Sequence, residues 1–405
     1  MRRRTFALSL PLGLAMLSAC GPETTEEDPA ALPDPPSDLE PEPVPNGEKA
    51  ESVDLSTVSL PLEMTTMIVV DPGWTSTPLE RDGMFLAYDD TGDRLRFVAA
   101  DQDGTVLWEA ERPLSCTGFA LSQDEDGRAI ATLADISPGD EGPWVMTLSG
   151  YDLRTAETLW GPTEVPGPQA GQGLVFADPG DRPMGAGGPR IVLSAATGEP
   201  ALAEDDLEGG RILAEHGGVI LHTADTELVA LAAADGSELW RTALPGGLDP
   251  QRARIVGAID PTTELAVLGD GDGPGAVLDL SDGSLLAEEA DAVARDHLLD
   301  VTVVASGTVV RGLEPDGEEA WRHEDPEELV FVSAGGRLAY AQRPEEGTLV
   351  VLDVGQGVMV HPYDVDVQAP LGVPEVFSLE GAAAVRVETA RLLVTTELDE
   401  NFGMR

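Results

Sequence analysis

The side chains that could do chemistry in this chain are few and scattered. Two acidic, glycine-rich turns, at residues 124–127 and 270–275, offer the oxygen ligands that calcium prefers. Neither turn continues into the EF-hand spacing, which places a ligand at position five and a glutamate at position twelve. Hairpin turns also need aspartate and glycine for their backbone geometry. We therefore expect structural turns at both places, with calcium binding as the alternative.

The histidines and cysteines do not form a recognisable site either. The five histidines lack the short spacings of a metal centre and are His216, His222, His297, His323 and His361. Cys116 lies in the stretch 114–119, which has the pattern of a strand edge, and is predicted to be a buried, inert thiol, with a reactive thiol as the alternative. The sequence has no Gly-x-Ser-x-Gly elbow and no phosphate-binding glycine loop. We expect no catalytic residue, no bound cofactor and no metal.

The first twenty residues have the pattern of an export signal. Three arginines precede an apolar stretch, residues 5–17, which is too short to cross a bilayer as a helix. The Leu-Ser-Ala-Cys sequence that ends at Cys20 resembles the lipobox of bacterial lipoproteins. This resemblance implies a signal peptide at residues 1–19, lipidation of Cys20 and a membrane anchor outside the cytoplasm, at the cell surface or in the periplasm. The consecutive arginines leave both general and twin-arginine export open.

Residues 20–56 form a second distinct segment. Proline, glutamate, aspartate, alanine and threonine dominate it, and it has no aromatic residue. Such a segment buries too little apolar surface to offset the entropy of ordering it. The sequence therefore predicts a lipidated, disordered tether at 20–56 and a folded domain at 57–405.

The chain is strongly acidic, with a formal net charge of −50 at pH 7. This charge repels nucleic acids and anionic lipid surfaces, which excludes both as partners. It suits a solvated surface or a cationic partner. We therefore expect membrane contact through the lipid anchor only.

A short β-unit recurs seven times between Gly104 and Gly357, with about 42 residues from copy to copy. Each unit is an apolar strand, a tight acidic or glycine turn and a second strand. Four copies carry a tryptophan four residues after the turn position, and these are Trp108, Trp160, Trp240 and Trp321. The other three copies have Leu202, Ala287 and His361 there. A period of this length with short strands predicts an all-β propeller of four-stranded blades.

The tryptophans are expected to hold the blades together. We predict that each lies on the third strand of its blade and fills the wedge beside the next blade, contributing about 2–3 kcal/mol. Eight blades of about 43 residues fit residues 57–398, with seven blades as the alternative. The last three strands, at 376–398, lack a partner that residues 58–70 could supply. The prediction is a ring closed by its N- and C-terminal strands.

Two stretches resemble the tryptophan-docking motif of the pyrroloquinoline-quinone-like (PQQ-like) propeller repeat family. The matching residues are Ala230, Gly236 and Trp240 in one copy and Asp152, Thr155 and Trp160 in the other. The family includes quinone-dependent alcohol dehydrogenases and an outer-membrane assembly lipoprotein. The resemblance implies that a quinone enzyme would need a vicinal cysteine pair, which this sequence lacks.

The sequence therefore favours a lipid-anchored, non-catalytic propeller that binds a protein or another envelope component. One alternative is a degenerate quinoprotein, or another small-molecule binder that uses the central funnel. A second is an assembly factor resembling the outer-membrane lipoprotein. The identity of the partner stays open.

Overall fold

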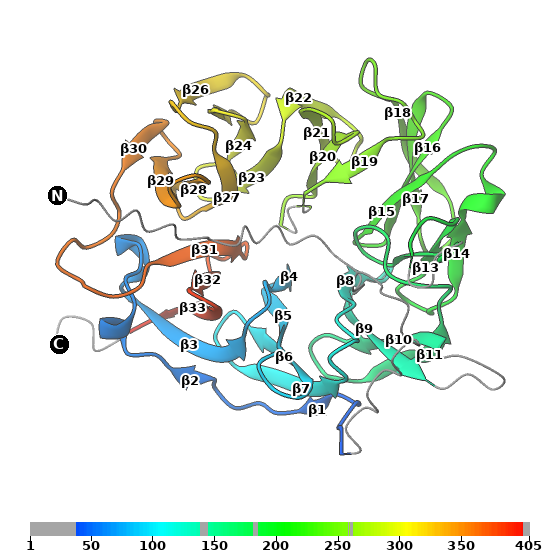
Figure 1. Cartoon of the computed structure of the whole chain (residues 1–405), viewed down its shortest axis with the longest axis horizontal. Coiled ribbons are helices and arrows are strands. Elements are labelled where there is room, and N and C mark those ends of the chain that lie inside the picture. Colours follow the sequence, from blue (N-terminus) through cyan, green and yellow to red (C-terminus); the bar gives the residue numbers. More distant parts are fainter. Residues whose placement is uncertain (1–37, 138–144, 181–184, 258, 260–261, 400–405) are drawn as a thin grey trace, which may run out of the picture.

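The structure is a computed structural model that describes residues 38–137, 145–180, 185–257, 259 and 262–399. The predicted signal peptide (residues 1–19) and the predicted lipidation site, Cys20, lie outside these residues. Eight β-sheets stand around a central axis, so the predicted eight-bladed, all-β propeller is confirmed (Figure 1). No helix in the described part of the chain is long and apolar enough to cross a membrane.

Each blade is an antiparallel meander. Blade 1 is β4 (Leu79–Arg81), β5 (Met84–Asp89), β6 (Leu95–Asp101) and β7 (Val106–Arg112); blade 2 is β8 (Phe119–Gln123), β9 (Ala129–Ser137), β10 (Val145–Asp152) and β11 (Thr158–Glu164). Blade 3 is β12 (Val175–Ala177), β13 (Arg190–Leu193) and β14 (Pro200–Ala203); blade 4 is β15 (Ile212–His216), β16 (Val219–Ala224), β17 (Glu227–Ala232) and β18 (Glu238–Ala243). Blade 5 is β19 (Arg254–Val256), β20 (Leu265–Gly269), β21 (Gly275–Asp279) and β22 (Leu285–Ala290).

The remaining blades complete the ring. Blade 6 is β23 (Ala292–Asp296), β24 (Val301–Ser306), β25 (Val309–Leu313) and β26 (Glu319–Glu324); blade 7 is β27 (Val330–Gly335), β28 (Leu338–Arg343), β29 (Thr348–Asp353) and β30 (Val358–Val360). Blade 8 is β31 (Gly372–Phe377), β32 (Ala383–Val387), β33 (Ala390–Leu398) and β3 (Met67–Trp74). Two short strands, β1 (Val44–Pro45) and β2 (Glu51–Ser52), and three 3-10 turns, η1 (Leu55–Thr57), η2 (Leu62–Met64) and η3 (Glu204–Asp206), lie outside this pattern.

The middle strands are apolar on both faces because a neighbouring blade covers each face. In β5, Phe85 packs toward blade 8 and Leu86 toward blade 2, and both side chains are fully buried. Blade 3 departs from the four-stranded rule. Its innermost strand is reduced to one bridge, between Gln169 and Phe176.

The N-terminal strand closes the ring, as predicted, although its bounds differ from the predicted 58–70. β3 pairs antiparallel with β33, with Val70 opposite Leu393. It is the partner of the third strand, β33, and forms the fourth strand of blade 8. Residues 55–64 instead contain the two 3-10 turns η1 and η2, so the extended stretch begins only at Met67.

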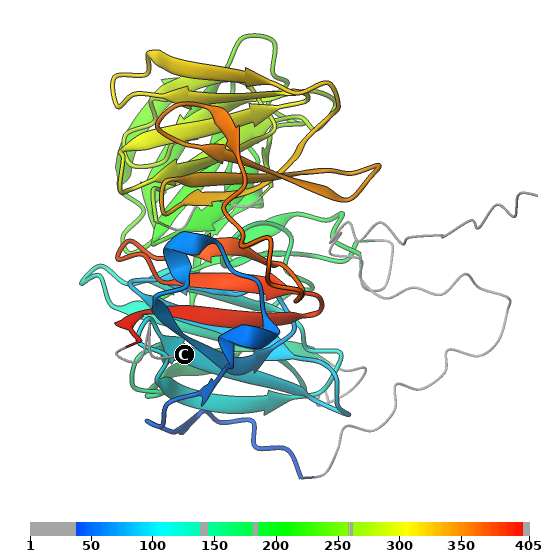
Figure 2. The same cartoon turned by 90° about the vertical axis from the view of Figure 1, so that its left-hand side faces the viewer.

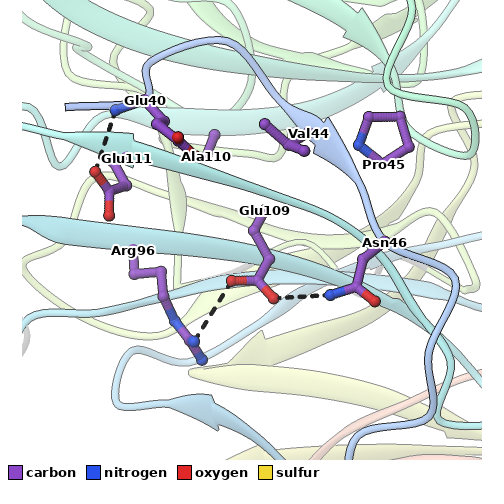
Figure 3. Close-up of a pocket in the computed structure, with 8 residues that line it drawn as sticks. All are labelled: Glu40, Val44, Pro45, Asn46, Arg96, Glu109, Ala110 and Glu111. Atoms are coloured by element: carbon purple, nitrogen blue, oxygen red, sulfur yellow. Dashed lines mark hydrogen bonds and ion pairs between the residues drawn. The ribbon is translucent and has the colours of Figure 1, made fainter. Parts of the chain in front are cut away.

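The predicted tether ends earlier than expected. Residues 38–56, which we call the strap, run along the outside of blades 1 and 8: β1 pairs with β7 and β2 pairs with β3. In Figure 3, Asn46 of the strap donates to Glu109 of β7 (3.1 Å) and the amide of Glu40 donates to Glu111 (3.1 Å). The unpaired backbone of two outer strands supplies hydrogen bonds that the strap's composition does not reveal. The folded domain therefore begins near residue 38 instead of 57.

Seen from the side, the blades stack as tilted sheets, and the two turns η1 and η2 lie against the strands of blade 8 (Figure 2). Strap, closing strand and C-terminal strand thus meet on one side of the ring.

Candidate functional site

The four repeat tryptophans lie on the fourth strands β7, β11, β18 and β26, so the predicted third strand is wrong. Each indole Nε1 donates to a backbone carbonyl oxygen of the next blade. The acceptors are Leu153 for Trp108 (2.7 Å), Ala195 for Trp160 (2.6 Å), Leu280 for Trp240 (2.8 Å) and Val354 for Trp321 (2.5 Å). These bonds join blades 1 to 2, 2 to 3, 4 to 5 and 6 to 7.

Each indole also needs small residues on both of its faces. A Cβ added to Gly150, opposite Trp160 within blade 2, would lie 2.3 Å from the ring. A Cβ added to Gly198, in the turn of blade 3, would lie 2.2 Å from the same ring. The other three rings face a Gly or Ala on each side: Ala99 and Ala156, Ala230 and Gly283, and Gly312 and Gly357. The repeated small residues therefore leave a narrow space between two blades, into which the flat indole ring fits.

The turn residue of the repeat has a positive φ in all seven copies. The φ angles are 82° at Gly104, 67° at Ala156, 70° at Gly198, 70° at Gly236, 76° at Gly283, 84° at Gly317 and 67° at Gly357. Glycine reaches this region without steric cost, which explains its recurrence. The repeat is thus accounted for by backbone geometry and packing.

A fifth tryptophan, Trp74, holds the closure and was missed in the sequence. It is fully buried at the end of β3, and its Nε1 donates to the carbonyl oxygen of Val98 in blade 1 (2.9 Å). It does not follow the turn-to-tryptophan spacing, so the repeat gave no signal for it.

The centre of the ring holds a cavity of about 420 Å³. Its lining is mostly polar and comes from several blades; it includes Arg81, Gln123, Thr263, Glu264, Arg295 and His297. The size lies in the range of small-molecule pockets. The sequence-based alternative of a small-molecule binder assigned the ligand to a central funnel, and this cavity occupies that position.

A buried polar cluster borders this cavity. Arg81 Nη1 donates to Gln123 Oε1 (3.0 Å), and Arg81 Nη2 donates to His216 Nε2 (3.2 Å), so the imidazole accepts and is neutral. Glu215 accepts hydrogen bonds from the Ser122 hydroxyl (2.6 Å) and from backbone amides. The cluster ties blades 1, 2 and 4 together across the centre.

Burial sets the protonation of this cluster. It raises the pKa of the fully buried Glu215 carboxyl. Burial, followed by the nearby Arg81 charge, lowers the pKa of His216 from 6.5 to about 3. A proton on His216 would both break the bond from Arg81 and place two cations side by side.

We predict that His216 makes the protein sensitive to acid. The unfolded chain binds a proton at pH values below about 6.5, whereas the folded chain does so only near 3, so stability is lost as the pH falls through this window. Between pH 7 and pH 5, the wild type should lose about 2 kcal/mol more than the His216→Gln variant. Urea unfolding at the two pH values measures the difference; equal losses in the two proteins would contradict the assignment.

Cys116 is buried, with an exposed fraction of 3%, and its pKa is raised to about 11 by burial and by Asp135. The structure places it as the sequence predicted. Because little thiolate forms at pH 8, we expect iodoacetamide to label native Cys116 at least about a hundredfold more slowly than the urea-unfolded chain. Mass spectrometry of the labelled peptide checks this, with Cys116→Ser as the blank. Equal rates in the folded and unfolded protein would contradict burial of the thiol.

The two acidic turns are used by the fold. Asp124 accepts from the backbone amides of Asp126 and Arg128 and pairs with the Arg128 guanidinium (2.8 Å). Asp270 accepts from the amide of Asp272 (3.0 Å). Among the described residues, no group of three or more His, Cys, Asp or Glu side chains is placed to hold a metal ion.

Several exposed apolar side chains lie on the outer strand of blade 7 and in the loop that leads from it to blade 8. The exposed fractions are 49% for Val358 and 44% for Met359 in β30, and 89%, 36% and 48% for Val365, Val367 and Leu371 in the following loop. Leu62 of η2, 52% exposed, joins them because its amide donates to the carbonyl oxygen of Pro362 (2.7 Å). We call these six residues the blade 7 rim. No sequence motif marked them.

Part of the chain matches the model of a known family. The model of the family described as outer membrane protein assembly factor BamB matches residues 146–297, from β10 to β23. BamB from Moraxella catarrhalis is 13% identical, with a TM-score of 0.42 over 86% of this chain and 99% of that chain. Sqt1 from Saccharomyces cerevisiae is 10% identical, with a TM-score of 0.36 over 89% of this chain and 100% of that chain. No curated protein matches the chain in sequence.

The matched segment contains Trp160 and Trp240, the two docking tryptophans whose surroundings fit the family motif. The family match and the eight repeated sheets agree. The chain is an eight-bladed β-propeller, and its residues 146–297 match the PQQ-like repeat family.

Proposed function

We propose that this protein is a lipid-anchored, extracytoplasmic and non-catalytic propeller that binds a protein partner at the blade 7 rim. The rim is the observation that carries the proposal. Exposed apolar side chains that gather in one place mark interaction surfaces, whereas single ones are ordinary. In a chain of net charge −50, six exposed apolar residues on one strand, its following loop and η2 are an unusual concentration, with the exposed Asp364 and Asp366 among them.

The family supports the same class of function. The matching family is described as an assembly factor of outer membrane proteins. A comparable role in assembly is a special case of the proposal, because an assembly factor acts by binding other proteins. The acidic surface favours a partner that carries basic residues.

Partner retention tests the proposal. Full-length protein with an affinity tag is purified from its own envelope in mild detergent as wild type, as Val365→Asp and as Leu239→Asp. Leu239 is 52% exposed on β18 of blade 4 and serves as the matched control. We expect a partner that wild type and Leu239→Asp retain in fixed ratio to be lost from Val365→Asp. Retention by all three proteins, or by none, would overturn the rim as the binding surface.

The lipid anchor has its own test. Cys20→Ser removes the thiol that the lipobox resemblance marks for acylation. We expect the wild type in the membrane fraction and the variant in the soluble extracytoplasmic fraction. An unchanged distribution would contradict the anchor.

A small-molecule binder is the second candidate, and one observation favours it. Arg81 Nε and Thr263 Oγ1 both belong to residues that line the central cavity and are buried without a hydrogen-bond partner in the described part of the chain. Buried polar groups normally have partners, so a ligand here would satisfy them. A rise in melting temperature with a ligand, lost in Arg81→Gln, would support this candidate.

A further inference from the structure

The outer strands of the eight blades form the perimeter of the ring, and each has a backbone edge that could pair with another strand. Natural sheets protect such edges by covering them, or by placing charged residues or proline on them. We therefore compared the eight outer strands to find an edge that lacks this protection and could pair with another strand.

Seven of the eight outer strands are protected. β1 covers β7 and β2 covers β3. The other protected strands carry these residues: Pro162 and Glu164 in β11, Pro200 in β14, Glu238 and Arg241 in β18, Glu288 and Glu289 in β22, and Glu319, Arg322 and Glu324 in β26.

β30 is the exception. Its sequence is Val-Met-Val, it has neither charge nor proline, and it pairs with β29 on one side only. In antiparallel strands, backbone groups alternate between the two edges, so part of the β30 backbone faces outward. The strand ends the blade 7 sheet on the outside of the ring (Figure 1).

We infer that β30 receives an extended strand of the partner, which adds to blade 7 as its fifth strand. This inference rests on the proposed function and names its binding mode. The strap already does the same on blades 1 and 8, where two-residue strands pair with β7 and β3. The fold therefore accepts short added strands on its outer edges.

The surroundings of β30 define the chemistry of that strand. Because β30 has only three residues, backbone pairing supplies few bonds, and the apolar side chains of Val365, Val367 and Leu371 must add contact area. Asp364 and Asp366 are exposed between these side chains. The fitting partner segment is extended, with alternating apolar and basic residues. A second copy of this chain is disfavoured because each copy carries −50.

A pair of peptides tests strand addition. Full-length protein is titrated with the fluorescent, capped peptide Lys-Val-Lys-Val-Lys-Val-Lys, and with Lys-Val-Lys-Pro-Lys-Val-Lys, at about 0.15 M salt. Both peptides carry the same charge, but the central proline lacks an amide donor and disrupts pairing. We expect about tenfold weaker binding of the proline peptide, and the same loss for the first peptide with Met359→Pro but not with Met359→Ala.

Hydrogen exchange of the wild-type protein gives a second readout. It is independent of whether the Met359→Pro variant folds. The first peptide should slow exchange in a peptic fragment that contains β30 and leave fragments of β18 and β26 unchanged. Equal binding of both peptides would show attraction by charge alone and overturn strand addition, as would no binding. Neither result touches the proposed function, because loss of the native partner from Val365→Asp reports on the rim independently.

Discussion

Replacing Trp108 by alanine is expected to lower the free energy of unfolding by about 3–5 kcal/mol. The side chain is fully buried between Ala99 and Ala156, and its Nε1 donates to Leu153 of the next blade. Alanine removes the ring from the wedge between two blades and leaves a cavity there. Urea unfolding followed by far-UV circular dichroism measures the loss.

Two variants separate packing from hydrogen bonding at this junction. Trp108→Phe keeps most of the ring and removes the Nε1 donor, so it should cost less than the alanine variant. Trp240→Ala is the matched control at another junction: Trp240 makes the same bond to Leu280 but is only partly buried. We expect a smaller loss there than at Trp108. A larger loss at Trp240 would show that burial at the blade junction does not determine the effect.

Replacing Val70 by aspartate is expected to cost about 4 kcal/mol or more, because it buries a charge. Val70 is 2% exposed in the closing strand β3 and packs in the cluster shared by blades 8 and 1, with Val106 and Leu393. A carboxylate there has no cation to pair with in that cluster and opposes the pairing of β3 with β33.

The control variant introduces the same valine-to-aspartate change at an exposed position. Val358→Asp on β30, where Val358 is 49% exposed, should change stability by no more than about 0.5 kcal/mol. Limited proteolysis provides the structural readout, since an opened ring should be cut first near β3 and β33. If both variants were equally stable, closure by the N-terminal strand would be wrong.

The sequence predicted the ring because the signals for it are local. A hairpin turn with a residue at positive φ, such as Gly236 or Gly283, and a tryptophan four residues later lie within one short window. Seven such turns gave the repeat period, and the length of residues 57–398 divided by that period gave eight blades. The assignment to the third strand failed because the innermost strand of a blade is short and weakly patterned, as blade 3 shows with its single bridge at Gln169.

The strap and the closing tryptophan could not be predicted because they depend on distant partners. Val44 and Pro45 lie opposite Glu109 and Trp108 of β7, which are more than sixty positions away along the chain. The hydrogen bond from Asn46 to Glu109, for example, joins residues that are 63 positions apart. Composition alone makes the strap resemble a disordered segment. Trp74 lies on a strand that the repeat does not include.

The blade 7 rim could not be recognised from the sequence. The stretch 358–360 is the outer strand of blade 7, and it is uncharged in a chain whose charged residues make up 24%. That absence gains meaning only when the other outer strands can be compared, which requires the fold. The fold is thus predicted from the local repeat, whereas the interaction surface is recognised only when the outer strands are compared in the folded ring.

Site-specific photo-crosslinking in the native envelope tests whether a partner binds at the blade 7 rim. A photoreactive amino acid is placed in the full-length protein at Met359 of β30 or, as the control, at Leu239 of β18. We expect one strong crosslinked product from position 359, whose partner is the protein lost from Val365→Asp, and no such product from position 239. The same product from both positions, or from position 239 alone, would contradict partner binding at the blade 7 rim.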